Sequence, residues 1–89
     1  MLRKEITICN KLGLHARAAA KFVTLAAQFT SDIQLARGPQ QVNGKSIMGV
    51  MMLAASQGTG LEIIACGADE IEACQQLGAL VERRFDEAE

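Results

Sequence analysis

Apolar residues in this chain recur with two different periods, and residues that favour turns divide the periodic segments into seven short elements. A repeat of two residues is typical of strands, and steps of three and four residues are typical of helices. One sheet must bury a face against the helices, so the order βαββαβα predicts a two-layer α+β sandwich. We expect strands over residues 5–9, 33–35, 41–43 and 61–66, and helices over residues 16–28, 47–53 and from 70 onward.

The second and third helices follow residues that favour helix N-termini. Ser46 directly precedes the second helix and is expected to cap it. Asp69 precedes the third, and Glu72 three residues later completes the pattern of a capping box. The apolar face of this third helix is expected to consist of Ile71, Cys74, Leu77, Gly78, Val81 and Phe85.

Length and composition exclude several classes of protein. The 89 residues suit a single domain over 1–89, and 49% apolar with 21% charged residues is ordinary for a globular chain. The longest mostly apolar run, Ile47–Ala55, is shorter than the roughly 20 residues of a membrane span. Without Trp or Tyr, the chain lacks an aromatic platform for stacking bases. We expect neither membrane insertion nor nucleic-acid binding.

The cysteines and the single histidine do not follow a metal-binding pattern. Cys9, Cys66 and Cys74 form no CxxC pair and are odd in number. We therefore expect no metal and no cofactor, and we expect the cysteines to be core residues of a reduced chain. The N-terminus has no apolar signal core, so a cytoplasmic location is expected.

Charge is divided unevenly along the chain. Residues 1–45 carry seven basic and two acidic side chains, a net +5, and residues 46–89 carry two basic and eight acidic ones, a net −6. Either the solvated faces simply differ, or the basic half meets an anion or an acidic partner.

His15, the only histidine, lies between a loop that contains Gly13 and the helix expected from Ala16. The first turn of a helix directs unpaired N–H groups outward, which makes an anion site, and Arg17 can pair with the same anion. An imidazole beside these groups is a coherent phosphoryl acceptor. The residues alone leave a second interpretation open, in which His15 is merely a polar loop or capping residue.

Two motifs resemble a known family. The segment Leu12–Arg17, LGLHAR, is followed thirty residues later by Asn43–Met51, NGKSIMGVM. Both resemble the HPr phosphocarriers of the bacterial phosphotransferase system, and the resemblance extends over essentially the whole chain. It implies an open-faced β-sandwich in which three helices cover one face of a four-stranded antiparallel sheet.

The resemblance also implies a function. His15 would accept a phosphoryl group on Nδ1 from enzyme I and pass it to an enzyme IIA domain, while Arg17 steadies the group. The chain would be a carrier, not an enzyme, and a monomer. The family usually has proline where this chain has Ala18, and we expect phosphoryl transfer to survive this departure with a different rate or partner preference. In part of the family the serine that matches Ser46 is phosphorylated by an HPr kinase/phosphorylase.

The second helix is rich in methionine, and its short length means that not all of its apolar side chains can be buried. Flexible methionines suit a surface that accepts several partners. By position in the family, the docking surface would consist of Ala16, Ala20, Lys21, Ile47, Met48 and Met51, with Lys45 at its rim.

Two other functions remain open. The first is the nitrogen-branch paralogue NPr, to which the ending Phe85–Glu87 and the loop Asn10–Gly13 bear some likeness, whereas the stretch around Ser46 favours HPr. The second is a regulatory binding module that carries phosphate on Ser46 and has no relay activity.

Overall fold

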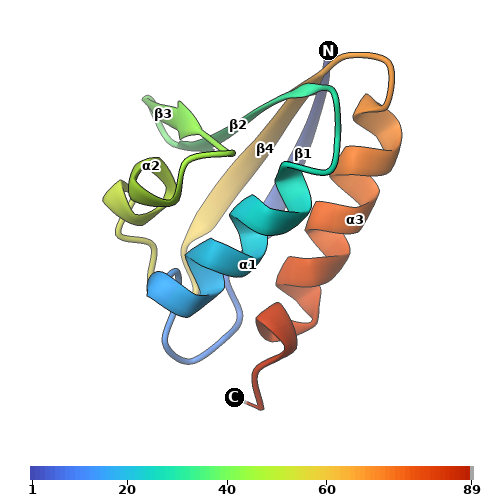
Figure 1. The fold of residues 1–89 in the computed structure, drawn as a ribbon. Coiled ribbons are helices and arrows are strands. Elements are labelled where there is room, and N and C mark those ends of the chain that lie inside the picture. Colours follow the sequence, from blue (N-terminus) through green and yellow to red (C-terminus); the bar gives the residue numbers. More distant parts are fainter. Residues whose placement is uncertain (89) are drawn as a thin grey trace.

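One four-stranded sheet forms the rear layer of the computed structural model, which describes residues 1–88 (Figure 1). The strands run in the order β1-β4-β2-β3, and every neighbouring pair is antiparallel. Their bounds are β1 (Leu2–Thr7), β2 (Asp32–Arg37), β3 (Gln40–Asn43) and β4 (Gly60–Cys66).

Three helices lie on one face of this sheet (Figure 1). They are α1 (Ala16–Ala26), α2 (Ile47–Met52) and α3 (Glu70–Glu82), and a short 3-10 turn, η1 (Arg84–Asp86), follows α3. The predicted element order and the open-faced α+β sandwich are therefore confirmed.

The core lies between the two layers because strands and helices each present one apolar face to it. Ile33 and Leu35 of β2 alternate with polar neighbours and are fully buried. They belong to the same buried cluster as Phe22 of α1, which is 1% exposed. The register sets Ile33 opposite Ala65 and Leu35 opposite Ile63, so the apolar rows of β2 and β4 coincide.

Two predicted boundaries shift. The first strand was expected over residues 5–9 but begins at Leu2, which pairs with Ala65, and ends at Thr7. Ile8 leaves the ladder, and its backbone groups bond Gly58 and Thr59 in the turn before β4. The first helix ends at Ala26, not at residue 28, because the amides of Gln28 and Phe29 donate to carbonyls three residues back, as in a 3-10 turn.

The predicted capping box at α3 is wrong. Asp69 occupies the N-cap position, but its carboxylate makes no cap hydrogen bond. Its oxygens instead accept from the backbone N–H of Thr30 and from the N–H and hydroxyl of Ser31. Asp69 therefore joins the start of α3 to the loop between α1 and β2. Its carboxylate bonds this loop instead of the helix because tertiary packing brings the loop donors within reach.

The predicted apolar face of α3 also needs correction. Ile71 is 64% exposed, because it lies in the first turn beyond the edge of the core. Phe85 is fully buried, but it belongs to η1 and not to the helix, which ends at Glu82. The residues that α3 buries are Ala73, Cys74, Leu77, Gly78, Leu80 and Val81.

Only one cysteine is a core residue. Cys74 is buried on α3, and burial raises the pKa of its thiol. Cys9 is half-buried, with its sulfur 3.2 Å from the carbonyl oxygen of Val81. Cys66 is exposed at the end of β4, so the expectation of three core cysteines is wrong. Within residues 1–88, no helix has the length and apolar character needed to cross a membrane.

Candidate functional site

The loop before α1 is fixed by a close approach of two backbone segments. Gly13 has φ +68°, a conformation that favours glycine, and a β-carbon there would overlap the carbonyl oxygen of Ala55. The next amide, Leu14 N–H, donates to that same oxygen at 2.9 Å. The loop is thereby tied to the segment that follows α2, and His15 is placed at the start of α1.

His15 is the N-cap residue of α1. Its backbone is extended, and its carbonyl oxygen accepts the first helical hydrogen bond, from Ala19 at 2.8 Å. Its side chain turns back over the first turn, where Nδ1 accepts from the backbone N–H of Arg17 at 3.3 Å. An accepting Nδ1 carries a lone pair, so the proton of the neutral ring is on Nε2. The capping interpretation and the nucleophile interpretation therefore describe the same geometry.

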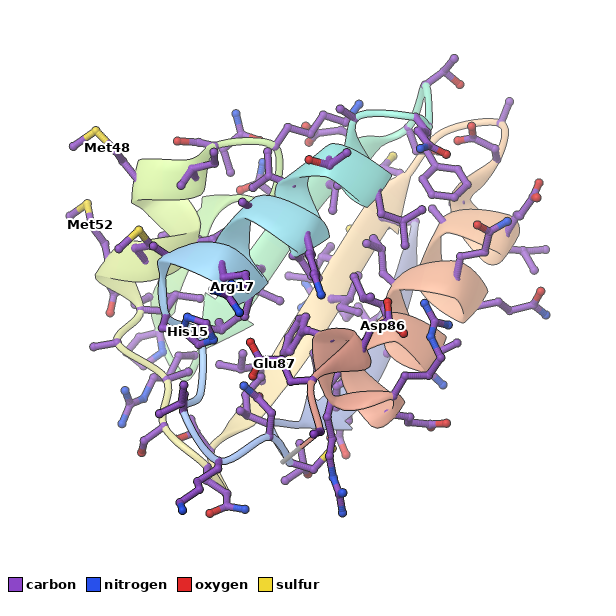
Figure 2. All side chains as sticks on the ribbon, turned by 60° about the horizontal axis from the view of Figure 1, so that its bottom comes forward. His15, Arg17, Met48, Met52, Asp86 and Glu87 are labelled. Carbon is purple, nitrogen blue, oxygen red and sulfur yellow. The ribbon has the colours of Figure 1, made fainter. Side chains whose placement is uncertain are left out.

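The other ring nitrogen of His15 faces a carboxylate from the C-terminal end of the chain. Nε2 lies 2.5 Å from Oε2 of Glu87, and the two side chains adjoin at the start of α1 (Figure 2). The second oxygen of Glu87 accepts from Nδ2 of Asn10 at 3.0 Å. Because that Nδ2 also donates to the Gly13 carbonyl at 2.8 Å, the carboxylate is anchored to the His15 loop at both oxygens.

Glu87 is ionised in this environment. Burial by itself raises the pKa of this carboxyl, but the hydrogen bonds from Asn10 and His15, with the positive charge of Lys21, lower it below its usual value. Its side chain is only 13% exposed, so little water competes for its oxygens.

A cleft of about 420 Å³ adjoins this pair, and three cationic side chains are among its walls. Lys21 donates from Nζ to the Phe85 carbonyl at 2.7 Å, so its ammonium holds the C-terminal segment. Arg17 is exposed, and within residues 1–88 its guanidinium has no hydrogen bond or ion pair. The cleft is lined by Lys11, Leu12, Arg17, Lys21, Asp86, Glu87 and Ala88.

This arrangement can bind and accept an anionic group. Amide N–H groups of the first turn of α1 and the guanidinium of Arg17 are available to phosphoryl oxygens beside Nδ1. Among the described residues, no cluster of His, Cys, Asp and Glu side chains is suited to hold a metal ion.

The family model for the PTS HPr component phosphorylation site matches residues 2–83.

The chain belongs to the HPr family.

The similarity to individual HPr proteins covers the full chain. The phosphocarrier protein HPr of Neisseria meningitidis is 52% identical over 89 residues, which is all of both chains. A crystal structure of HPr-C-His from Thermoanaerobacter tengcongensis superposes with a TM-score of 0.95 at 46% identity, again over both whole chains. The phosphocarrier protein NPr of Shewanella violacea is 40% identical over 87 residues, 98% of this chain and 96% of that one. The comparisons favour HPr over the nitrogen branch.

Ala18, where the family resemblance led us to expect proline, lies inside α1. Ala18 is the third residue of the helix, and its side chain is fully buried. Its N–H belongs to the first turn, where amides lack a helical partner. Alanine in place of proline therefore adds a donor near His15 and preserves the helix.

Ser46 is the N-cap of α2, as predicted. Its Oγ accepts from the Gly49 N–H at 3.1 Å, and its side chain is half-buried. Val50 and the following Leu53 face the core, whereas the remaining apolar side chains of α2 do not. Met48 and Met52 are 77% and 68% exposed and project away from the body of the molecule (Figure 2).

The residues predicted for the docking surface differ in their exposure. Ala16, Ile47, Met48 and Met51 are exposed, whereas Ala20 is half-buried. The two lysines predicted to join them are half-buried. Lys45 donates from Nζ to the Phe29 carbonyl at 2.7 Å, as Lys21 does to Phe85, so both ammonium groups also anchor the fold.

Sequence reasoning missed two residues of the site, Asn10 and Glu87. Asn10 is a fully buried polar side chain in a loop, and its Oδ1 has no hydrogen-bond partner among the described residues. Glu87 lies in an acidic C-terminal stretch that reads as a solvated end. The sequence signal that could have pointed to Glu87 is Phe85, because an aromatic residue in this segment indicates that the segment packs against the fold.

Proposed function

We propose that this chain is a phosphocarrier whose His15 accepts a phosphoryl group from the phosphohistidine of enzyme I and donates it to enzyme IIA. Phosphoenolpyruvate would be the original donor. The observation that carries the proposal is the lone pair of His15 Nδ1 at the N-terminus of α1, beside the N–H and guanidinium groups of Arg17. The chain would act as a carrier that is loaded and unloaded, with catalysis shared with its partners.

The transfer is chemically simple. The P–N bond of the donor phosphohistidine breaks as a P–N bond to Nδ1 of His15 forms, and the donor imidazole leaves with the electron pair. The proton on Nε2 of His15 stays in place. The Arg17 N–H that had bonded Nδ1 is released to a phosphoryl oxygen, and the Arg17 guanidinium adds charge-assisted hydrogen bonds.

The docking surface would serve both partners in turn. Exposed side chains of α2 and of the start of α1 adjoin, because these helices pack together. Flexible methionines adapt to different partners, and Arg17 favours partners with acidic surfaces. Such a relay needs fast release and hence a small interface. We propose that the carrier acts as a cytoplasmic monomer.

The test is incubation with phosphoenolpyruvate and enzyme I, followed by intact mass and an acid-stability assay. We expect one phosphoryl group that is lost in acid and is absent from His15→Ala. Wild-type protein that stays unmodified while folded would overturn the relay and favour the regulatory binding module. The rate at which Ala18→Pro is loaded, compared with that of the wild type, measures the effect of alanine in place of proline on phosphoryl transfer. Sedimentation tests the monomer, since an HPr of T. tengcongensis has been crystallised as a dimer.

We also propose that Ser46 is a regulatory phosphorylation site. Phosphate at a helix N-terminus is electrostatically favourable, yet the added charge would lie next to the exposed side chains of α2 and repel an acidic partner. Incubation with ATP and HPr kinase/phosphorylase is expected to add an acid-stable phosphate that Ser46→Ala lacks. An unmodified Ser46 under those conditions would contradict this regulation.

A further inference from the structure

The segment after α3 returns to His15 through an unusual backbone. Arg84, Phe85 and Asp86 have φ values of 58°, 54° and 60°. Three consecutive residues other than glycine in the left-handed region cost about 1–2 kcal/mol each, so the surrounding structure must impose this turn.

Side-chain interactions reinforce the turn, which backbone hydrogen bonds from Asp86 to Arg83 and from Glu87 to Arg84 close. The Phe85 side chain is fully buried in the core, and its carbonyl accepts from Lys21 Nζ at 2.7 Å. Arg83 Nε donates to Asp86 Oδ1 at 3.0 Å across the turn. The chain then becomes extended at Glu87, with φ −86° and ψ 150°, which directs the carboxylate onto the imidazole.

We propose that Glu87 is a positioning residue, whose carboxylate holds the proton on His15 Nε2, closes that nitrogen to phosphorylation and leaves Nδ1 as the acceptor. This inference rests on the proposed function, because it concerns the same phosphoryl transfer. The contacts that carry it are the 2.5 Å approach of Glu87 to Nε2 and the donation from Arg17 N–H to Nδ1. One ring nitrogen thus faces a hydrogen-bond donor, and the other faces a hydrogen-bond acceptor.

The carboxylate also has a role after transfer. A phosphoryl group on Nδ1 gives the ring a positive charge if Nε2 keeps its proton, and a neutral imidazole is then the leaving group when the group moves on. Glu87 accepts that proton's hydrogen bond and stabilises the charged ring. The charged groups around the pair are those of Arg17, Lys21 and Asp86, together with Lys11 in the cleft wall.

The nitrogen that reacts can be tested without a partner protein. Potassium phosphoramidate phosphorylates imidazoles directly: its P–N bond breaks, ammonia leaves, and a P–N bond forms to one ring nitrogen. Phosphorus NMR of the product distinguishes the Nδ1 isomer from the Nε2 isomer. The proteins to compare are the wild type, Glu87→Ala, Glu87→Gln and the matched control Glu82→Ala, which removes an exposed carboxylate at the end of α3.

We expect wild type and Glu82→Ala to give mainly the Nδ1 isomer, with the same small Nε2 fraction. Glu87→Ala should raise the Nε2 fraction about tenfold or more, the effect of losing one hydrogen bond to a charged group. Glu87→Gln should give an intermediate Nε2 fraction. The glutamine side chain has one acceptor oxygen, whereas the Glu87 carboxylate has two, one facing Asn10 and the other facing His15. An Nδ1-only product in folded Glu87→Ala and Glu87→Gln would overturn the inference.

The outcome is independent of the relay. If enzyme I fails to load the wild type but Glu87→Ala changes the isomer, the proposed function fails and the positioning role stands. If enzyme I loads His15 and the isomer is unchanged in the Glu87 variants, the positioning role alone fails.

Discussion

Oε2 of Glu87 and Nε2 of His15 lie 2.5 Å apart, although 72 positions separate them along the chain. The contact joins the first turn of α1 to the segment that follows α3, and Asn10 ties the same carboxylate to the loop before His15. A histidine at a helix N-terminus is therefore held at both ring nitrogens, by a backbone donor on one side and a carboxylate on the other.

Gly13→Ala is expected to destabilise the fold by about 2 kcal/mol or more, since it adds left-handed strain and an overlap with the Ala55 carbonyl. Gly38→Ala is the matched control, because Gly38 also has positive φ but no atom near its missing β-carbon. Urea unfolding of both variants measures the difference. Equal losses would show that the overlap costs nothing.

Phe85→Ala is expected to lower the free energy of unfolding by about 3–5 kcal/mol, the usual effect of removing a buried aromatic side chain. It should also release the C-terminal segment, because the left-handed turn depends on this anchor. Hydrogen exchange at residues 85–87 should accelerate more than exchange in β4. Phe85→Leu, which keeps much of the apolar volume, should lose less stability.

Asp69 is expected to make stability depend on pH in acid. The hydroxyl hydrogen bond from Ser31, with the backbone donors of Thr30 and Ser31, lowers its pKa from 3.8 to about 2 in the folded state. A folded pKa below the unfolded value stabilises the fold above the unfolded pKa, and this contribution is lost as pH falls from about 4 towards 2.

Asp69→Asn should therefore have a shallower loss of stability than the wild type between about pH 4 and pH 2. Glu70 and Glu87, whose pKa values are also lowered, keep their own contributions. Thermal unfolding across this range measures the slope. Ser31→Ala removes one of the donors to Asp69 and should reduce this slope only in part. Identical slopes in all three proteins would show that Asp69 is not the source of the acid dependence.

Ser46→Ala is expected to cost about 1 kcal/mol, the usual effect of removing an N-cap acceptor, because Gly49 N–H loses its partner. For a domain of this size that lowers Tm by about 4–8 °C. Ser46→Asp keeps an acceptor oxygen and adds a favourable charge at the helix N-terminus, so it should retain wild-type stability. A Tm for Ser46→Asp as low as that of Ser46→Ala would contradict the capping role.

Much of the fold was predictable because its signals are local. Alternation in residues 33–35 and 61–66 and the helical spacing after Ala16 placed the elements, and Ser46 was correctly identified as a cap. Asp69 carries an equally good capping signal, yet its carboxylate binds Ser31, 38 positions away. Capping propensity depends only on residues within one turn of the helix N-terminus. It does not take into account hydrogen-bond donors that another loop places beside the carboxylate.

The order of the elements, the helix N-terminus at His15 and membership of the HPr family can all be read from local patterns, since periodicity, capping residues and motif spacing depend on residues close in the chain. The contact of Glu87 with the imidazole depends on long-range packing. That contact requires α3 to pack on the sheet, Phe85 to enter the core and three left-handed residues to reverse the chain. Such a conformation is locally unfavourable, so no local pattern predicts it, and only long-range packing stabilises it.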